Sequence, residues 1–265
     1  EIRAMTYIGS AHSFAGEPRV ALEWHERALA LAEGTGNREV FFRVLNGRGI
    51  ARWALGELDG AREDHERVLA ACRERGLGFG ETASLNCLAE IEYNAGHLDR
   101  AMAWAQEALR RSSQVGDRRG EATAIENIAT IRNLRGEHDA AIAGFLEAQR
   151  LAGEIGLRYG ETSIRLGLAS AYRGLGDAER ALAYGEQALA TMRESGRLVL
   201  EVAALREIAR CRLDLGDPVA AAVAADEAVS LAKTRGQALA EARSREVLEL
   251  VRQAAGGPGG ASVLN

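Results

Sequence analysis

Residues 116–156 read GDRRGEATAIENIATIRNLRGEHDAAIAGFLEAQRLAGEIG, and this stretch decides the fold. Between Gly120 and Gly136, apolar residues recur three and four positions apart, which is the period of one face of an α-helix. The same spacing resumes after Gly136 and runs through Ala141 and Phe145. Glycine suits the position just past a helix end because, without a Cβ, it adopts the left-handed conformation at no steric cost. The stretch therefore predicts two amphipathic helices joined by a glycine turn.

The same hairpin recurs along the chain with a period of 40 residues. Two glycine series and one alanine series keep this period without a slip. Their members are Gly16, Gly56, Gly96, Gly136, Gly176 and Gly216; Gly36, Gly76, Gly116, Gly156, Gly196 and Gly236; and Ala21, Ala61, Ala101, Ala141, Ala181 and Ala221. A fixed period of this size is typical of solenoids, in which each repeat packs on its neighbours. We therefore predict six helical hairpins stacked along the chain.

The bulk composition favours helices and excludes several functions. Of the 265 residues, 47% are hydrophobic and only 5% aromatic, so strand-forming residues are scarce. A formal charge of −5 argues against a surface that binds nucleic acid throughout, and no apolar run reaches the ~18 residues of a membrane span. Cys72, Cys87 and Cys211 are far apart and lack a CxxC motif, which suits a reducing compartment. Because the N-terminus also lacks a signal-peptide pattern, we expect a cytoplasmic protein without a membrane partner.

Small residues mark the points where the two helices of each hairpin cross. On the first helices they are Gly9, Gly49, Ala89, Ala129, Ala169 and Ala209. Together with the alanine series and turns such as Leu175-Gly176-Asp177, this pattern resembles the tetratricopeptide repeat. It departs from the usual unit of ~34 residues by about six residues, and glycine replaces the proline that ends the family's repeat. The 40-residue form is similar to the Partner-of-Inscuteable adaptors and to the repeat arrays of many bacterial signalling ATPases and transcriptional regulators.

The resemblance implies an all-α fold, a right-handed superhelical solenoid of six antiparallel helical hairpins followed by a polar capping helix. We expect the solenoid to cover residues 1–255 and a disordered Gly/Pro tail to occupy residues 256–265. The expected repeats are 1–36, 37–76, 77–116, 117–156, 157–196 and 197–236, with the capping helix at 237–255. The first repeat has no cap and no initiator Met. We therefore expect a fragment whose upstream domains are missing, with self-association through the uncapped repeat as one option.

The first helices of such a solenoid line its concave face, where the family binds ligands. Carried over register by register, the family's groove positions fall on Arg43, Asn46, Trp53, Asn86, Glu90, Tyr93, Glu126, Thr130, Asn133, Arg173, Arg206 and Arg210, and Asn127 flanks the same surface. Amides both donate and accept hydrogen bonds, and a guanidinium group binds a carboxylate through two parallel hydrogen bonds. This set therefore suits the backbone and the carboxylates of an extended peptide. The alternative is a solvated helix face without a ligand.

Two aromatic residues and one cysteine on first helices have two readings each. Trp53 and Tyr93 are one period apart and would form an aromatic ledge in the groove, where aromatic side chains are typical anchors. The alternative is that both lie in the seam between repeats, because burial is the commoner fate of aromatic residues. Cys87 either faces the groove or packs in the core as a small hydrophobic residue.

The sequence does not indicate a metal, a cofactor or a catalytic centre. His25 and His65 are equivalent residues on neighbouring second helices, about 10 Å apart, which is too far to share one ion through bonds near 2 Å. The Gly78-Phe79-Gly80 run lies between two helices and not after a strand, so it does not predict a nucleotide site. We therefore expect a protein that is not an enzyme and holds no cofactor.

The hypothesis that accounts for these features is a protein- or peptide-binding scaffold, the regulatory or oligomerising arm of a larger bacterial signalling or transcriptional regulator. An alternative is a small-molecule-sensing or catalytic groove that uses Glu90, Glu126 and Arg173. A third hypothesis, nucleic-acid binding along the groove arginines, is disfavoured because acidic residues interrupt the basic stripe. These residues are Glu90, Glu126, Glu207 and Asp214.

Overall fold

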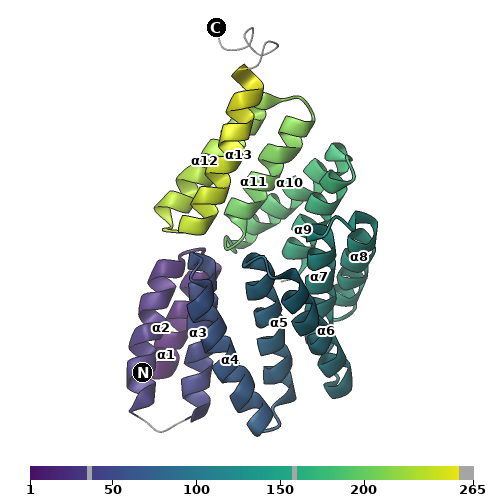
Figure 1. Cartoon of the computed structure of the whole chain (residues 1–265). Helices are drawn as coiled ribbons and strands as arrows, with labels where there is room; N and C mark the ends of the chain where they lie inside the picture. Colours follow the sequence, from purple (N-terminus) through teal and green to yellow (C-terminus); the bar gives the residue numbers. More distant parts are fainter. Residues whose placement is uncertain (35–37, 157–159, 257–265) are drawn as a thin grey trace.

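The computed structural model describes residues 1–34, 38–156 and 160–256, and all regular structure in those ranges is helical (Figure 1). The first helices of the hairpins are α1 (Ile2–Phe14), α3 (Arg38–Leu55), α5 (Gly78–Asn94), α7 (Arg118–Leu134), α9 (Glu161–Gly174) and α11 (Glu201–Asp214). The second helices are α2 (Pro18–Glu33), α4 (Leu58–Glu74), α6 (Leu98–Val115), α8 (His138–Glu154), α10 (Ala178–Ser195) and α12 (Pro218–Thr234), and α13 (Ala238–Gly256) follows. The predicted all-α solenoid is confirmed. The predicted turn glycine Gly36 and residues 257–265 of the predicted tail lie outside the described residues.

Each second helix packs on the first helix before it and on the first helix after it. The turns that allow this have glycine where the backbone demands it. Every described member of the two glycine series has a positive φ, between 65° and 85°, the region that L side chains avoid. The alanine series is completely buried at the helix crossings, where a larger side chain would force the helices apart. The 40-residue pattern therefore records both the turns and the contacts of the hairpins.

Two histidines occupy core positions that the sequence analysis considered only as metal ligands. His25 and His65 stand at the same register as Phe145, and all three side chains are almost completely buried. A Cβ added at Gly9 would lie 2.8 Å from Nε2 of His25, so the ring fills the space that this glycine leaves. Neither ring nitrogen of His25 has a hydrogen-bond partner, and burial lowers the pKa of His25 to about 4. The core thus holds neutral imidazole rings.

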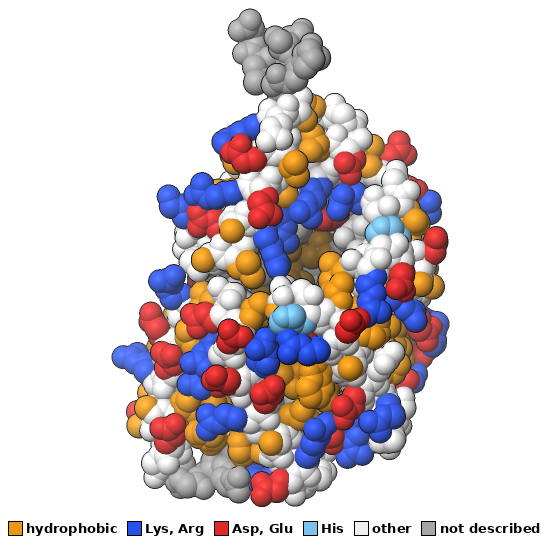
Figure 2. All heavy atoms as spheres, in the orientation of Figure 1, with side chains coloured by type: hydrophobic (Ala, Val, Ile, Leu, Met, Phe, Trp, Pro, Cys, Tyr) orange, Lys and Arg blue, Asp and Glu red, His pale blue; other side chains and the backbone are white. Residues whose placement is uncertain are grey.

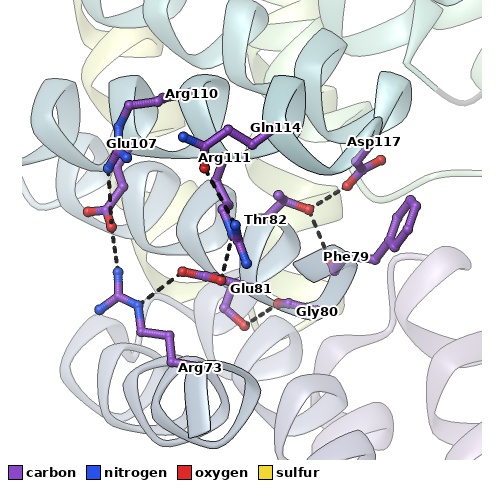
Figure 3. A network of polar contacts seen from close by, with 11 residues as sticks. Arg73, Phe79, Gly80, Glu81, Thr82, Glu107, Arg110, Arg111, Gln114 and Asp117 are labelled. Carbon is purple, nitrogen blue, oxygen red and sulfur yellow. Dashed lines mark hydrogen bonds and ion pairs between the residues drawn. The ribbon is translucent and has the colours of Figure 1, made fainter. Parts of the chain in front are cut away.

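Figure 3 shows a charged network that joins helices of neighbouring repeats. Arg73 of α4 and Arg111 of α6 both reach the carboxylate of Glu81 at the start of α5, with Nε to oxygen distances of 3.2 and 2.8 Å. Arg73 also pairs with Glu107 of α6 at 2.5 Å. Glu81 is buried, and a buried carboxylate is tolerated only when it is paired and hydrogen-bonded. The network therefore fixes how α4, α5 and α6 pack.

Three members of this network, Arg73, Glu81 and Glu107, have equivalents three periods later, and a differently placed arginine supplies the fourth. Arg193 of α10 pairs with Glu201 of α11 at 2.8 Å and with Glu227 of α12 at 2.5 Å. Arg235, just after α12, pairs with the other carboxylate oxygen of Glu201 at 2.7 Å. Each half of the chain thus holds one of its first helices by an arginine on either side of a buried glutamate.

The last repeats return to the first and close the solenoid on itself. The backbone N–H of Leu198, between α10 and α11, donates to the carbonyl oxygen of Phe14 at the end of α1 at 2.9 Å. Arg243 of α13 donates from Nη1 to Oδ1 of Asn94 at 3.3 Å and from Nη2 to its carbonyl oxygen at 3.2 Å. In Figure 1 the beginning of α13 accordingly lies against the ends of the first helices. The concave face is therefore enclosed from both ends of the chain.

The helix predicted as a polar cap is α13. It buries Val247, Leu248 and Val251 against α11 and α12, and exposes Arg245 and Glu249 on the outside. A terminal helix with one apolar and one polar face is what a solenoid needs at its end. None of the helices in the described ranges has the length and apolar character that crossing a bilayer requires.

Candidate functional site: the enclosed concave face

Two carboxylates on neighbouring first helices form the acidic part of the concave face. Glu90 on α5 accepts a hydrogen bond from the Tyr93 hydroxyl at 3.4 Å. Glu126 on α7 faces the hydroxyl of Ser163 on α9, which donates to the carbonyl oxygen of Gly160 at 3.1 Å. Burial raises the pKa of each carboxyl group to about 7, and the pKa of Glu126 is raised further by the charge of Glu90. Neither carboxylate has an ion-pair partner among the residues that the structure describes.

Three arginines on α11 and α13 form the basic part. Arg206 is half-buried and makes neither a hydrogen bond nor an ion pair within the described part of the chain. Burial lowers its pKa to about 10, and the charges of Arg210 and Arg243 lower it further. Arg210 lies 3.8 Å from Glu207, whose carboxylate is already held by Arg173 at 2.7 Å. The cluster therefore keeps an uncompensated positive charge.

Closure of the solenoid brings Arg243 of the basic part to Asn94, which lies one helical turn after Glu90 of the acidic part. Arg243 binds Asn94, the last residue of α5, and the Asn94 side chain donates to the carbonyl oxygen of Glu90 at 2.9 Å. Figure 2 shows a hollow near the middle of the face in view, with basic side chains at its rim and hydrophobic side chains in its depth.

A family model for the tetratricopeptide repeat matches residues 82–115 and 162–195. The two matches begin two 40-residue periods apart, so the same unit is matched in two places. The chain is an array of tetratricopeptide repeats. A search of curated proteins finds no significant match. The repeat assignment therefore rests on the period, on the two family matches and on the fold.

Solved structures with the same fold cover nearly the whole array. The Rap protein complexed with competence and sporulation factor superposes with a TM-score of 0.67 at 15% identity, over 96% of this chain and 87% of that one. NprR in complex with its cognate peptide NprX gives 0.68 at 15% identity, over 95% and 71%. A signal transduction ATPase from Pyrococcus horikoshii with a tetratricopeptide repeat sensor gives 0.56 at 18% identity, over 96% and 39%.

The structure places two of the predicted groove amides inside the array and not in its groove. Asn86 of α5 donates to the carbonyl oxygen of Gly120 at 3.1 Å, and Asn127 of α7 donates to the backbone and side-chain oxygens of Asn86 at 3.2 Å. Both asparagines are buried, with 6% of their surface exposed. Their amides are used to hold α5 against α7, so they are not free to bind a ligand.

Three further predicted residues bond within the array. The Asn133 amide donates to the Ser170 hydroxyl at 3.0 Å, and its oxygen lies 2.7 Å from Nδ1 of His138. The Thr130 hydroxyl donates to the carbonyl oxygen of Glu126 at 3.0 Å. Arg173 is held by Glu207, as described above. The polar atoms of these three residues are therefore engaged within the array.

The remaining predicted residues lie on α3 and α5. Arg43 is exposed and pairs with Glu39 at 2.9 Å, one helical turn away. Asn46 and Trp53 are half-buried on α3. The Tyr93 ring packs against a core cluster that contains Ala89, which favours a position in the seam between repeats. Its hydroxyl group bonds to Glu90 in the groove. The predicted aromatic ledge remains a prediction.

The sequence analysis missed Asn94, Ser163 and Arg243. Ser163 and Arg243 stand three and five periods after Arg43, which was selected, so extending that register would have found both. Arg243 was passed over because its segment was interpreted only as a cap. Among the described residues, no three His, Cys, Asp or Glu side chains gather as a metal site would require.

Proposed function

We propose that this array is a peptide-binding module that serves as the sensing arm of a larger regulatory protein. The observation that carries the proposal is a set of ionisable side chains on the enclosed face that form no ion pair within the described part of the chain: Arg206, Glu90 and Glu126. Charged groups withdrawn from water are normally paired within the protein. Convergent charges without such partners in a concave surface are typical of a ligand site.

The comparisons support a peptide as the ligand. NprR was solved with its cognate peptide and Rap with the competence and sporulation factor, and the Pyrococcus ATPase carries a repeat sensor. At this level of identity the likeness extends to the fold alone, and the groove residues of this chain decide what it binds. A solenoid presents a long concave surface of this kind to extended ligands.

The cysteine in the groove region favours binding over catalysis. Burial raises the pKa of the Cys87 thiol to about 12, and the charge of Glu90 adds to this effect. The thiolate is the nucleophilic form of cysteine, so a thiol with such a pKa is a poor nucleophile at neutral pH. The groove thus offers charge and hydrogen bonds to a ligand without an activated nucleophile at this position.

Capture of peptides from a random library tests the proposal. The purified chain is immobilised and incubated with short peptides of random sequence, and the retained peptides are identified by mass spectrometry. We expect the wild-type chain and Arg110→Gln, an exposed arginine of α6, to retain the same set, and Arg206→Gln to lose it. Failure of the wild-type chain to enrich any peptide would contradict the proposed function.

A further inference from the structure

Closure of the array sets two kinds of turn against each other, and these lie on opposite edges of the solenoid. Some turns join the two helices of one hairpin, and others form the junction between one hairpin and the next. At the start of α13, Leu239 lies over Gly56 in the turn of the second hairpin, where an added Cβ would be 2.8 Å from the Leu239 Cβ. One hairpin earlier, the carbonyl oxygen of Leu198 lies over Gly16 in the same way, at 3.0 Å. Two neighbouring junctions thus pack on two neighbouring hairpin turns.

The junction between α4 and α5 presents the same kind of surface but is uncovered. Phe79 stands four periods before Leu239, as the second residue of its helix, and 64% of its surface is exposed. Leu77 is 49% exposed, and Figure 3 shows the Phe79 ring apart from the charged side chains of the network. The junction is closely packed from behind, because a Cβ on Gly78 would be 2.7 Å from Cγ1 of Val115 on α6. We call Leu77 and Phe79 the junction patch.

Two hairpin turns farther along the chain are free to receive such a patch. Gly136 and Gly176 stand three periods after the two glycines that closure covers, but no atom lies within 4 Å of a Cβ added to either. Beside them, Leu134 is 53% and Leu175 is 46% exposed. A single exposed leucine is ordinary on a protein surface, but these two flank turn glycines of the register that closure uses. We call these four residues the turn patch.

We propose that the junction patch of one copy of this array packs on the turn patch of a second copy. The contact would repeat between two chains the packing that closes a single chain. A second copy is the partner that fits, because this chain already packs the residues of its hairpin junctions on its own hairpin turns. The contact lies on the edges of the solenoid, outside the concave face, and it is independent of peptide binding.

The charges around the two patches are complementary. Near the junction patch, Arg75 and Arg119 are exposed and form no ion pair within the described part of the chain, while the exposed Glu74 has a partner of its own. Near the turn patch, the exposed Glu137 and Glu179 form no ion pair in the described residues, and the arginines of the same turns are held by aspartates of the chain. Complementary charges at an interface speed association and fix its orientation. Salt screens them, so assembly should weaken as salt is added.

The two patches differ, so the contact joins unlike surfaces. Every copy offers one junction patch and one turn patch, and copies therefore add head to tail. Such an assembly grows with protein concentration, and it stops only where the rotation between copies closes a ring. A chain that lacks one patch can still bind through the other.

Sedimentation velocity of the purified chain over a wide range of concentrations tests the proposal. We expect the wild-type chain to form larger species, whose share rises with concentration and falls with added salt. The double variants Leu77→Ser/Phe79→Ser and Leu134→Ser/Leu175→Ser should each lose assembly and sediment as single chains. Val223→Ser, at an equally exposed residue of α12, should assemble as the wild type does. Circular dichroism melts show that each variant is folded.

Mixing the two double variants distinguishes this contact from a symmetric one. The first variant keeps its turn patch and the second keeps its junction patch, so the mixture should form a dimer and nothing larger. A symmetric contact, in which both copies use the same surface, would not be restored by mixing. The inference is overturned if the wild-type chain stays a single chain at every concentration, if both double variants still assemble, or if their mixture forms no dimer.

Discussion

Arg243 of the last helix is bound through both terminal nitrogens to Asn94, which lies 149 residues earlier in the chain. This pair links α13 to the end of α5 and helps to close the array. Replacing Arg243 with Ala should cost only about 1–2 kcal/mol of stability, because two hydrogen bonds from a charged donor are lost. It should nevertheless open the array, which small-angle X-ray scattering would show as a larger radius of gyration.

Arg245→Ala is the matched control for this opening. Arg245 lies on the same helix but is exposed and bonds only to Glu241, one turn away. Its replacement should leave the scattering curve unchanged. If Arg243→Ala keeps the wild-type radius of gyration, the contact between Arg243 and Asn94 is a result of closure and is not needed to maintain it.

The two core histidines should make the fold sensitive to acid. The pKa of His25 and of His65 is lowered to about 4 by burial, below the value of about 6.5 in the unfolded chain. Between these pH values only the unfolded state binds the proton, so stability falls as pH drops from 6.5 towards 4. Each histidine contributes at most about 1.4 kcal/mol per pH unit to this loss.

The variant His25→Leu tests whether this histidine causes the acid sensitivity. Urea unfolding of His25→Leu between pH 7 and pH 4.5 should show a shallower loss of stability than the wild-type chain. Phe145→Leu, at the same register as His25 and without a titratable group, should keep the wild-type slope. Identical pH profiles for all three proteins would contradict the assignment.

Glu90 and Glu126 of the groove should make the fold less stable as the pH rises, which is opposite to the effect of the histidines. Burial raises the pKa of Glu90 and Glu126 to about 7, so the folded state keeps protons that the unfolded state has lost above about pH 4.5. The stability that this protonation provides is present below pH 4.5 and is lost as pH rises through 7. Glu90→Gln should therefore be more stable than the wild type by about 1–2 kcal/mol at pH 8 and by much less at pH 4, as thermal melts would show.

The network of Figure 3 offers a prediction with an internal control. Glu81→Gln leaves Arg73 and Arg111 without their shared buried partner and should cost about 2–3 kcal/mol in urea unfolding. Glu107→Gln removes a more exposed partner of the same Arg73 and should cost less than about 1 kcal/mol. Equal losses for the two variants would mean that burial of Glu81 does not set the strength of the network.

The hairpins could be predicted from the sequence because their determinants are local and repeated. Gly136 needs a positive φ at a fixed place in the turn, and Ala141 needs to be small at a fixed crossing, so each leaves a mark every 40 residues. The same logic predicts which residues lie on first helices. It does not show how far each first helix is turned, and this is why Asn86 and Asn127 were assigned to the groove while the structure uses them between α5 and α7.

The enclosed site could be predicted only in part. Glu90, Glu126 and Arg206 were selected from the register of single repeats. Their relation to Arg243 was not, because closure depends on the summed rotation of all repeats and on contacts such as Leu198 with Phe14. Contacts of this kind are made once and not in every repeat, so the 40-residue pattern of the sequence does not indicate them.

Isothermal titration calorimetry with one captured peptide measures whether Arg206 of the enclosed face binds the ligand. We predict that the wild-type chain and Arg110→Gln bind this peptide equally well, and that Arg206→Gln binds it at least tenfold more weakly. Equal affinity of Arg206→Gln and the wild-type chain for that peptide would contradict the claim that the unpaired charges of the enclosed face bind the ligand.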